Sequence, residues 1–108
     1  LHSAAVLASL SAHGIGWTDA AGHSVGEFGA LYSAGSIDFE SALELVRVRS
    51  AAMQEAAMAT PGGMLAVLGI DMPKAEQVCR RAAEKGICVP ANDNCPGQIV
   101  LSGEKAAL

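Results

Sequence analysis

The sequence predicts an α/β fold in which helices and strands follow one another in two successive parts of the chain. Three observations point to this class. A Gly-x-Ser-x-Gly turn at residues 22–26 stands between a short strand-like segment and a helix-compatible one. Apolar residues recur at helical spacing over residues 39–57, and short apolar runs follow a break at residues 60–63. We therefore expect residues 1–60 and 61–108 to belong to different structural parts.

The composition narrows the classes of partner that the protein can have. The 108 residues suffice for one small domain or part of a larger one, and with only 4% aromatic residues the core must consist of aliphatic side chains. A net charge of −4 without a basic cluster argues against nucleic acid as a partner. No apolar run approaches the length of a membrane span and no signal peptide is visible, so we expect no membrane partner.

The three cysteines, Cys79, Cys88 and Cys95, are odd in number and lack CxxC spacing. This pattern predicts reduced thiols in a cytoplasmic compartment rather than a disulfide framework, and no metal site.

The first part of the chain is predicted to contain three helices and one strand. Residues 1–13 form an Ala/Leu-rich amphipathic helix ended by Gly14, and residues 26–33 form a short helix ended by Gly35. Between them, residues 17–21 are expected to form the strand that leads into the Ser24 turn, although Asp19 is unusual for a buried strand. Asp38 is a suitable N-cap for a long helix over residues 39–57, whose apolar stripe comprises Ala42, Leu45, Val46, Ala52, Met53 and Ala56.

Beyond the Thr60–Gly63 break the pattern changes to short strands. We predict strands over residues 64–68, 87–91 and 98–102, with a helix from Asp71–Pro73 to Lys85 and a loop over residues 92–97. The order strand, helix, strand, strand is the opening of a split βαβ, ferredoxin-like unit. The chain begins on Leu1 within a helical pattern and ends on Leu108 where another helix begins, so we expect it to be a piece of a longer domain.

Ser24 is the candidate nucleophile, because it occupies the centre of Gly22-His23-Ser24-Val25-Gly26. In a nucleophile elbow the serine sits on a sharp turn between a strand and a helix, with its Oγ exposed. The glycines are expected to relieve crowding on both sides of the turn, and the Val25 N–H is the natural first donor to an oxyanion. The pentapeptide alone is equally compatible with a plain flexible turn.

Arg49 lies on the apolar stripe of the long helix, with apolar neighbours one turn away in both directions. Arg47, by contrast, belongs to a more polar face. An inward-facing guanidinium needs a carboxylate partner because its desolvation is costly. Two interpretations are open for Arg49. Its role is structural, as a member of an ion pair or as a snorkelling side chain, or it binds a substrate carboxylate through two hydrogen bonds.

Several spaced motifs together resemble the malonyl-CoA:acyl-carrier-protein transacylases and the acyltransferase domains of polyketide and fatty-acid synthases. The resemblance covers essentially the whole chain. The motifs are Ala21-Gly22-His23-Ser24-Val25-Gly26-Glu27-Phe28, Ala30-Leu31, Ala34-Gly35, Val46-Arg47-Val48-Arg49, Met53-Gln54-Glu55-Ala56, residues 63–69 and residues 92–103.

This resemblance implies an α/β-hydrolase-like large subdomain with the nucleophile elbow over residues 1–60, and the start of a ferredoxin-like small subdomain over residues 61–108. It implies ping-pong transfer of a malonyl group from malonyl-CoA, through a Ser24 ester, to the phosphopantetheine thiol of an acyl carrier protein. Arg49 would hold the malonyl carboxylate, the Val25 N–H would bind the oxyanion, and His23 would have a structural role in the elbow. No bound cofactor or metal is implied.

The chain departs from the family pattern in three respects. It contains neither the N-terminal glutamine motif that supplies the second oxyanion donor nor the downstream base histidine, and Trp17 stands where the family often has proline. A serine without a base is a weak nucleophile, and loss of one oxyanion donor costs about 3–4 kcal/mol. We therefore predict that these 108 residues alone transfer acyl groups poorly, and that the remainder of the acyltransferase domain is a required partner.

Two other functions remain open. A serine esterase or thioesterase of the α/β-hydrolase type would share the elbow but would not need Arg49. A non-catalytic piece that docks a carrier protein would leave Ser24 unused. Within the family, Arg49 favours a dicarboxylic acyl group, and His23-Ser24-Val25 favours malonyl over methylmalonyl.

Overall fold

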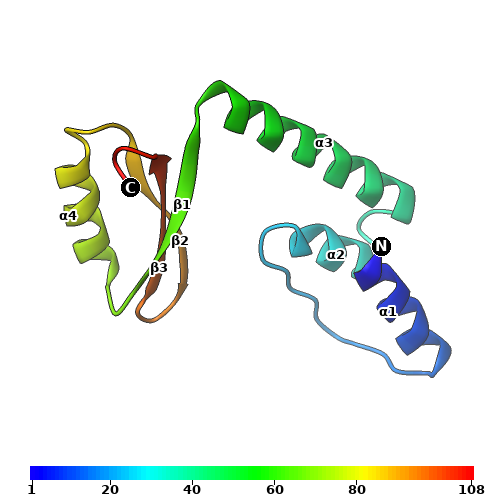
Figure 1. The fold of residues 1–108 in the computed structure, drawn as a ribbon. Coiled ribbons are helices and arrows are strands. Elements are labelled where there is room, and N and C mark those ends of the chain that lie inside the picture. Colours follow the sequence, from blue (N-terminus) through cyan, green and yellow to red (C-terminus); the bar gives the residue numbers. More distant parts are fainter. The chain divides into compact units, whose positions relative to one another are not determined.

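The computed structural model describes all residues from 1 to 108 and has a mixed α/β architecture (Figure 1). Its elements in chain order are α1 (His2–Ala12), α2 (Gly26–Ser33), α3 (Phe39–Ala59), β1 (Gly62–Leu68), α4 (Met72–Ala82), β2 (Cys88–Cys95) and β3 (Gln98–Glu104). The chain divides into two compact units, Leu1–Gln54 and Glu55–Leu108, which are described separately. None of the four helices combines the length and the apolarity that a membrane crossing requires.

The first unit contains α1, α2 and most of α3, and the three helices form where the sequence predicted them. Glycine ends the first two: Gly14 has φ 71° and Gly35 has φ 69°, the left-handed conformation in which glycine has no steric penalty. Leu7 and Leu10 of α1, three residues apart on one face of the helix, are half-buried.

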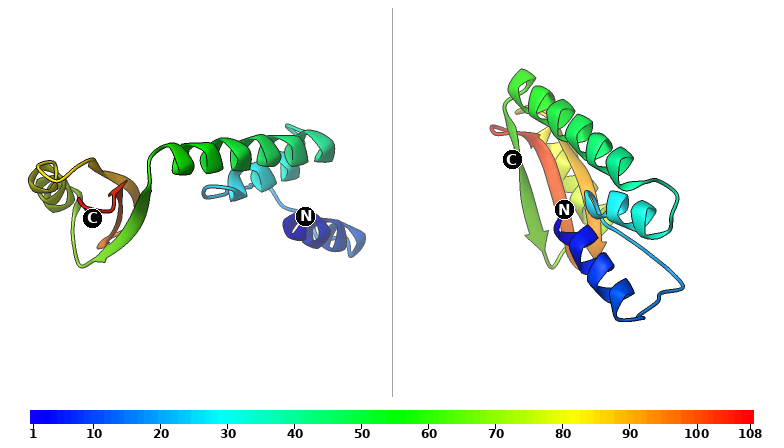
Figure 2. Two further views of the ribbon diagram at one scale, coloured as in Figure 1. Left: turned by 45° about the horizontal axis from the view of Figure 1, so that its top comes forward. Right: turned by 90° about the vertical axis from the view of Figure 1, so that its right-hand side faces the viewer.

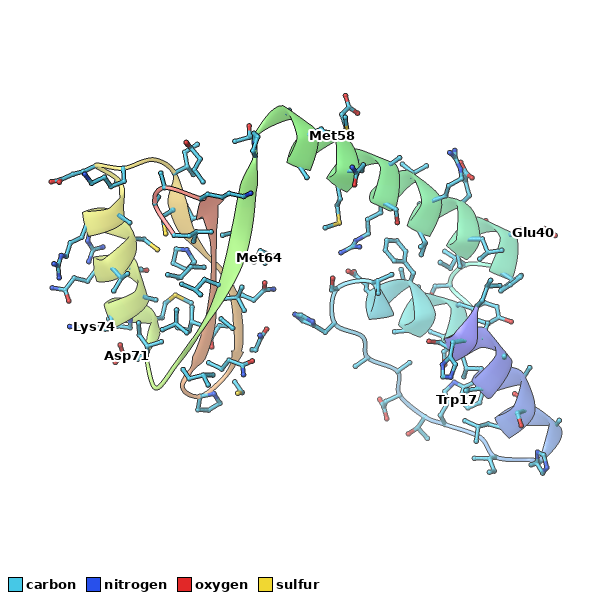
Figure 3. All side chains as sticks on the ribbon, in the orientation of Figure 1. Trp17, Glu40, Met58, Met64, Asp71 and Lys74 are labelled. Atoms are coloured by element: carbon cyan, nitrogen blue, oxygen red, sulfur yellow. The ribbon has the colours of Figure 1, made fainter.

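Helix α3 begins with a side-chain cap. The Asp38 Oδ1 accepts a hydrogen bond of 2.7 Å from the Ser41 N–H, which confirms the predicted N-cap. Glu40 lies in the first turn (Figure 3), where a negative charge complements the positive end of the helix dipole.

The apolar stripe predicted for α3 is only partly correct. Ala42, Val46 and Arg49 are half-buried, whereas Leu45 and Met53 are 41% and 55% exposed, and Ala52 and Ala56 are exposed as well. The apolar positions therefore exceed the surface that neighbouring elements of this unit cover.

The strand predicted over residues 17–21 is wrong. These residues form an irregular segment, because the first unit contains no strand with which they could pair. Trp17 instead fastens this segment to α2: its indole N–H donates a hydrogen bond of 3.1 Å to the Ser33 carbonyl oxygen at the end of that helix.

The second unit is a three-stranded sheet in the order β1-β3-β2 with α4 against it (Figures 1 and 2). Both outer strands are antiparallel to β3, so β1 and β2 are parallel to each other and α4 connects them. Asp71 caps α4 by accepting from the Lys74 N–H at 2.9 Å, with Pro73 in the first turn, as predicted; Figure 3 labels the two capping partners.

Several boundaries in this unit differ from the prediction: β1 begins at Gly62 rather than at residue 64, and β3 ends at Glu104 rather than at residue 102. Residues 92–95, expected in a loop, belong to β2, because pairing with β3 outweighs the low strand propensity of Asn and Asp. The register shifts twice in this strand, between Pro90 and Asn92 and between Asp93 and Cys95, as in β-bulges. Helix α4 ends at Ala82 rather than Lys85, and a turn completes the connection.

The buried core lies entirely in the second unit and joins α4 to the sheet. It consists of Ala75, Cys79, Cys88, Ile99 and Leu101. The Sγ atoms of Cys79 and Cys88 lie 3.6 Å apart, and Cys95 is exposed; none of the three forms a disulfide. Burial, reinforced by the Cys88 thiol, raises the pKa of Cys79 to about 11, so this thiol is protonated at neutral pH.

Candidate active site

Ser24 stands on a strained turn that leads directly into α2. Its φ of 55° makes it the only residue other than glycine with a positive φ in the chain, a conformation that costs about 1–3 kcal/mol. The Gly26 N–H donates to the His23 carbonyl at 2.9 Å and the Glu27 N–H donates to the Ser24 carbonyl at 3.2 Å, so the turn passes into the helix without interruption. The Ser24 side chain is exposed, as a nucleophile must be.

The two glycines of the motif have different roles. A Cβ on Gly22 would overlap the carbonyl group of Gly26, so the backbone of the turn approaches too closely for any side chain. A Cβ on Gly26 would meet nothing within 4 Å. The expectation that both glycines relieve crowding is therefore right for Gly22 and wrong for Gly26, which starts α2 in open space.

Val25 occupies the N-cap position of α2 with φ −62° and ψ −21°, and no side chain caps this end of the helix. The first N–H groups of a helix are natural donors to an anion. The Val25 side chain lines an apolar hollow of about 260 Å³ between α1, α2 and α3, with Phe28, Tyr32 and Phe39 among its walls. Ser24 and Arg49 do not line this hollow.

Arg49 reaches the Ser24 hydroxyl from α3. Its Nη2 donates a hydrogen bond of 2.8 Å to the Ser24 Oγ, across 25 positions of sequence. Arg49 is half-buried, on the same face of α3 as Ala42 and Val46. The structure thus brings together the two site residues singled out by sequence, although the partner of Arg49 is a hydroxyl and not the carboxylate that an inward guanidinium was expected to need.

Arg49 takes part in neither of the two ion pairs of the structure. Arg47 pairs with Glu44 at 2.6 Å, and Arg80 pairs with Glu76 at 3.6 Å. The bond from Arg47 lowers the pKa of Glu44 and raises that of Arg47, and both side chains are well exposed, as predicted for the polar face of α3. Neighbouring arginines on one helix therefore differ in environment: one has a carboxylate and the other has the candidate nucleophile.

His23, His13 and Trp17 make contacts that hold the local structure of the first unit. His23 precedes Ser24, and its carbonyl accepts the bond from Gly26 that closes the turn. His13 is tied to α1 through a 2.8 Å contact between its Nδ1 and the Ser9 carbonyl oxygen. Sequence reasoning missed the anchoring bond of Trp17; the signal available was a single tryptophan in an aromatic-poor chain.

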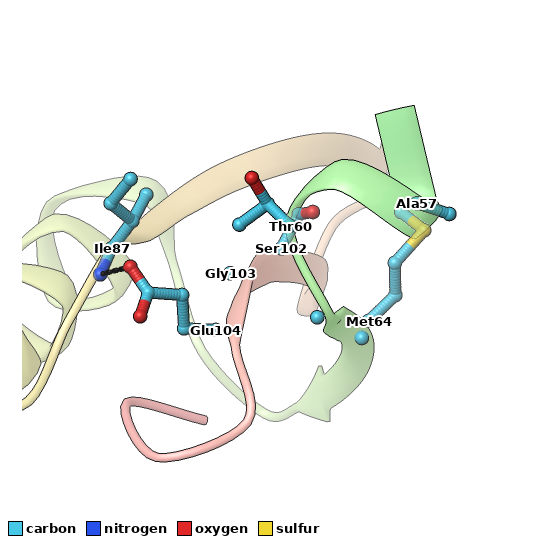
Figure 4. Close-up of a pocket in the computed structure, with 9 residues that line it drawn as sticks. Ala57, Thr60, Met64, Ile87, Ser102, Gly103 and Glu104 are labelled. Atoms are coloured by element: carbon cyan, nitrogen blue, oxygen red, sulfur yellow. Dashed lines mark hydrogen bonds between the residues drawn. The ribbon is translucent and has the colours of Figure 1, made fainter. Parts of the chain in front are cut away.

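The second unit has a hollow of its own, of about 320 Å³, where the end of α3 meets the sheet (Figure 4). Thr60, Met64, Ser102 and Glu104 are among its lining residues. The Glu104 carboxylate accepts a bond of 3.1 Å from the Ile87 N–H, drawn as a dashed line in Figure 4. No group of three or more His, Cys, Asp or Glu side chains in the chain could hold a metal ion.

With this geometry in place, the comparison with known proteins identifies the class. The chain belongs to the acyl transferase domain family, whose sequence profile matches residues 3–108. The resemblance carried by the spaced motifs is thereby confirmed.

Within this family, the chain is similar to malonyl-CoA:acyl carrier protein transacylases. It is 43% identical over 108 residues to the malonyl CoA-acyl carrier protein transacylase of Staphylococcus aureus (strain MRSA252), covering 99% of this chain and 34% of that protein. The crystal structure of the transacylase of the same name from Clostridium perfringens matches with a TM-score of 0.88 and 40% identity, over 97% of this chain and 33% of the other.

A third similar structure is a complex. It contains a type II PKS acyl-carrier protein with its malonyl-transacylase, and matches with a TM-score of 0.84 and 40% identity over 97% of this chain and 34% of that chain. The chain spans about a third of the length of the curated relatives that it matches.

Proposed function

We propose that the protein carrying this chain transfers a malonyl group from malonyl-CoA to the phosphopantetheine thiol of an acyl carrier protein, through an ester on Ser24. The observation that carries the proposal is the 2.8 Å bond between the Arg49 guanidinium and the Ser24 Oγ. A nucleophile and a carboxylate-binding cation side by side suit a short acyl thioester that ends in an acid. The names of the similar proteins support this substrate and this acceptor.

In the first half-reaction the Ser24 Oγ attacks the thioester carbonyl, so that an O–C bond forms and the C–S bond breaks. The hydroxyl proton leaves through a general base and ends on the departing CoA thiolate. In the second half-reaction the carrier thiol gives its proton to the base and attacks the ester carbonyl, so that a C–S bond forms, the acyl C–O bond to Ser24 breaks, and the proton returns to the Ser24 Oγ. In both, the Val25 N–H at the uncapped start of α2 stabilises the oxyanion.

Arg49 would hold the free carboxylate of the malonyl group. A planar guanidinium binds a carboxylate through two parallel N–H donors, which fixes orientation as well as charge. Its half-buried position on α3 favours this use, because partial exclusion of water strengthens the charge-assisted bond.

We also propose how the two parts of the chain belong to the larger domain. Residues 1–60 form part of an α/β-hydrolase-like large subdomain with a nucleophile elbow. The positive φ of Ser24 and the crowding at Gly22 support the elbow. Residues 61–108 form the start of a ferredoxin-like small subdomain, which the strand order β1-β3-β2 with α4 as crossover supports.

The first prediction tests the role of Ser24 by intact-mass measurement after brief exposure of the full-length natural protein to malonyl-CoA. We expect a single malonyl adduct on Ser24 in the unmodified protein and none in Ser24→Ala. Ser50→Ala is the matched control, because the Ser50 hydroxyl donates a hydrogen bond of 2.8 Å to the Val46 carbonyl oxygen. This substitution should leave the adduct on Ser24 intact. A malonyl adduct that persists in Ser24→Ala would exclude this mechanism.

The same experiment separates the alternatives. Addition of a holo carrier protein should remove the adduct from Ser24 and place it on the carrier thiol. Release of free malonate at the same rate with and without the carrier would identify a hydrolase, and the absence of any adduct would favour a docking role.

A further inference from the structure

The polar contact of the Arg49 side chain is with the candidate nucleophile. The Nη2–Oγ distance of 2.8 Å is that of a good hydrogen bond, and neither ion pair of the structure involves Arg49. The guanidinium has no lone pair to offer, so in this bond it can only donate and the Ser24 Oγ must accept.

This contact is weaker than the one that a substrate acid would make. A carboxylate accepts two charge-assisted bonds from a guanidinium, whereas the hydroxyl accepts one with no negative charge of its own. An arriving carboxylate therefore draws Arg49 away from Ser24. It can shift the equilibrium because it interacts differently with the released and the bound arginine.

The bond also affects the reactivity of the oxygen. The lone-pair density that Oγ shares with a cationic donor is the density that must attack the thioester carbonyl. The guanidinium, in hydrogen-bond contact, also occupies space beside Oγ into which the carbonyl carbon must approach to about 3 Å.

We infer that Arg49 restrains Ser24 in the resting protein and that the carboxylate of the substrate releases the restraint. The inference rests on the proposed function and adds a specificity device to it. An uncharged acyl thioester such as acetyl-CoA lacks the group that removes Arg49 and meets a blocked nucleophile. The free carboxylate of a dicarboxylic acyl thioester binds Arg49 and so frees Ser24.

The test supplies the missing carboxylate separately. Acetyl-CoA and free formate together offer the groups of a malonyl thioester in two pieces. In the full-length natural protein, formate should accelerate acetylation of Ser24 about tenfold, the order expected when one charge-assisted bond is lost. Chloride at equal ionic strength is the control, because a spherical anion cannot accept the planar pair of bonds.

Two variants complete the experiment. Arg49→Ala should acetylate at the accelerated rate without formate and should not respond to it. Arg47→Ala, on the same helix but paired with Glu44, should behave as the unmodified protein does. All acetylation rates are measured by intact mass.

The outcomes are distinguishable. If the unmodified protein takes no malonyl group on Ser24, the proposed function fails. If malonyl labelling is intact but neither formate nor Arg49→Ala raises acetylation, or if Arg49→Ala lowers it, the inference is overturned and the function stands. The formate measurement uses the unmodified protein, so it can overturn the inference even if the Arg49→Ala variant does not fold.

Discussion

Among single residues, the conformation of Ser24 depends most directly on Gly22. The backbone of the turn folds back so that the α-carbon of Gly22 faces the Gly26 carbonyl, with no space for a methyl group between them. The strained φ of Ser24 persists because this close approach and the helix behind it leave the serine no relaxed alternative.

A second prediction follows from the contrast between the two glycines. Gly22→Ala should displace the turn and lower the free energy of unfolding by about 3 kcal/mol, as overpacking does, with loss of malonyl labelling of Ser24 in the full-length protein. Gly26→Ala, in open space at the start of α2, should be neutral in both measurements. Equal effects of the two substitutions would show that the steric argument is wrong.

The sequence motif could predict that a turn carries Ser24 but not which glycine it needs. That distinction depends on a distance between backbone atoms that are four residues apart. Arg49 shows the same limit: helical spacing predicted its face, whereas its contact with Ser24 depends on how α3 packs beside the turn.

At the scale of elements, the cap of α3 matters to the site because this helix carries Arg49. The Ser41 backbone N–H donates to the Asp38 carboxylate, and this bond lowers the pKa of Asp38 below its ordinary value of 3.8. Because the folded pKa is lowered, the stabilisation is fully present above 3.8 and is lost as the pH falls through the folded value.

The third prediction concerns this pH dependence. An NMR titration of the Asp38 side chain should give a midpoint below 3.8, and the helical amide signals of the first turn of α3 should change over the same range. Asp38→Asn retains an accepting oxygen without the charge and should abolish the pH response of those amides. A midpoint at or above 3.8 would contradict the capping argument.

Elements with local signals were predicted well, and elements that depend on a partner were not. Asp38 and Asp71 mark helix starts through bonds that span three residues, so the sequence contains the whole motif. The strand over residues 17–21 was wrong because a strand requires a neighbour, and residues 92–95 were misassigned because β3 supplies one.

For the molecule as a whole, burial is distributed unequally between the two units. All five buried apolar residues lie in the second unit, and the helices α1, α2 and α3 bury none completely. Composition predicted an aliphatic core, which is only partly right because Cys79 and Cys88 belong to it. Composition could not show where the core lies; alanine-rich helices supply little apolar area for each residue. The 108-residue chain should therefore be less protected around Ser24 than in its sheet.

The fourth prediction tests this inequality by amide hydrogen exchange in the 108-residue chain. Ile99 is 1% exposed, and Ile99→Ala should cost about 2–5 kcal/mol and raise exchange along β3 while leaving α2 unchanged. Ile87→Ala is the matched control, because this side chain is 61% exposed and should change exchange little. Uniform acceleration in both units would show that they share one cooperative core.

The two edge strands of the sheet, β1 and β2, are not equivalent. Along β1 all seven residues keep an uninterrupted register with β3, whereas β2 carries Pro90 and two register shifts. A proline and local bulges interrupt the regular row of backbone donors and acceptors with which an added strand would pair. A regular edge strand offers that row without interruption. We therefore expect any further strand, whether from the same polypeptide or from another copy, to pair with β1 rather than with β2.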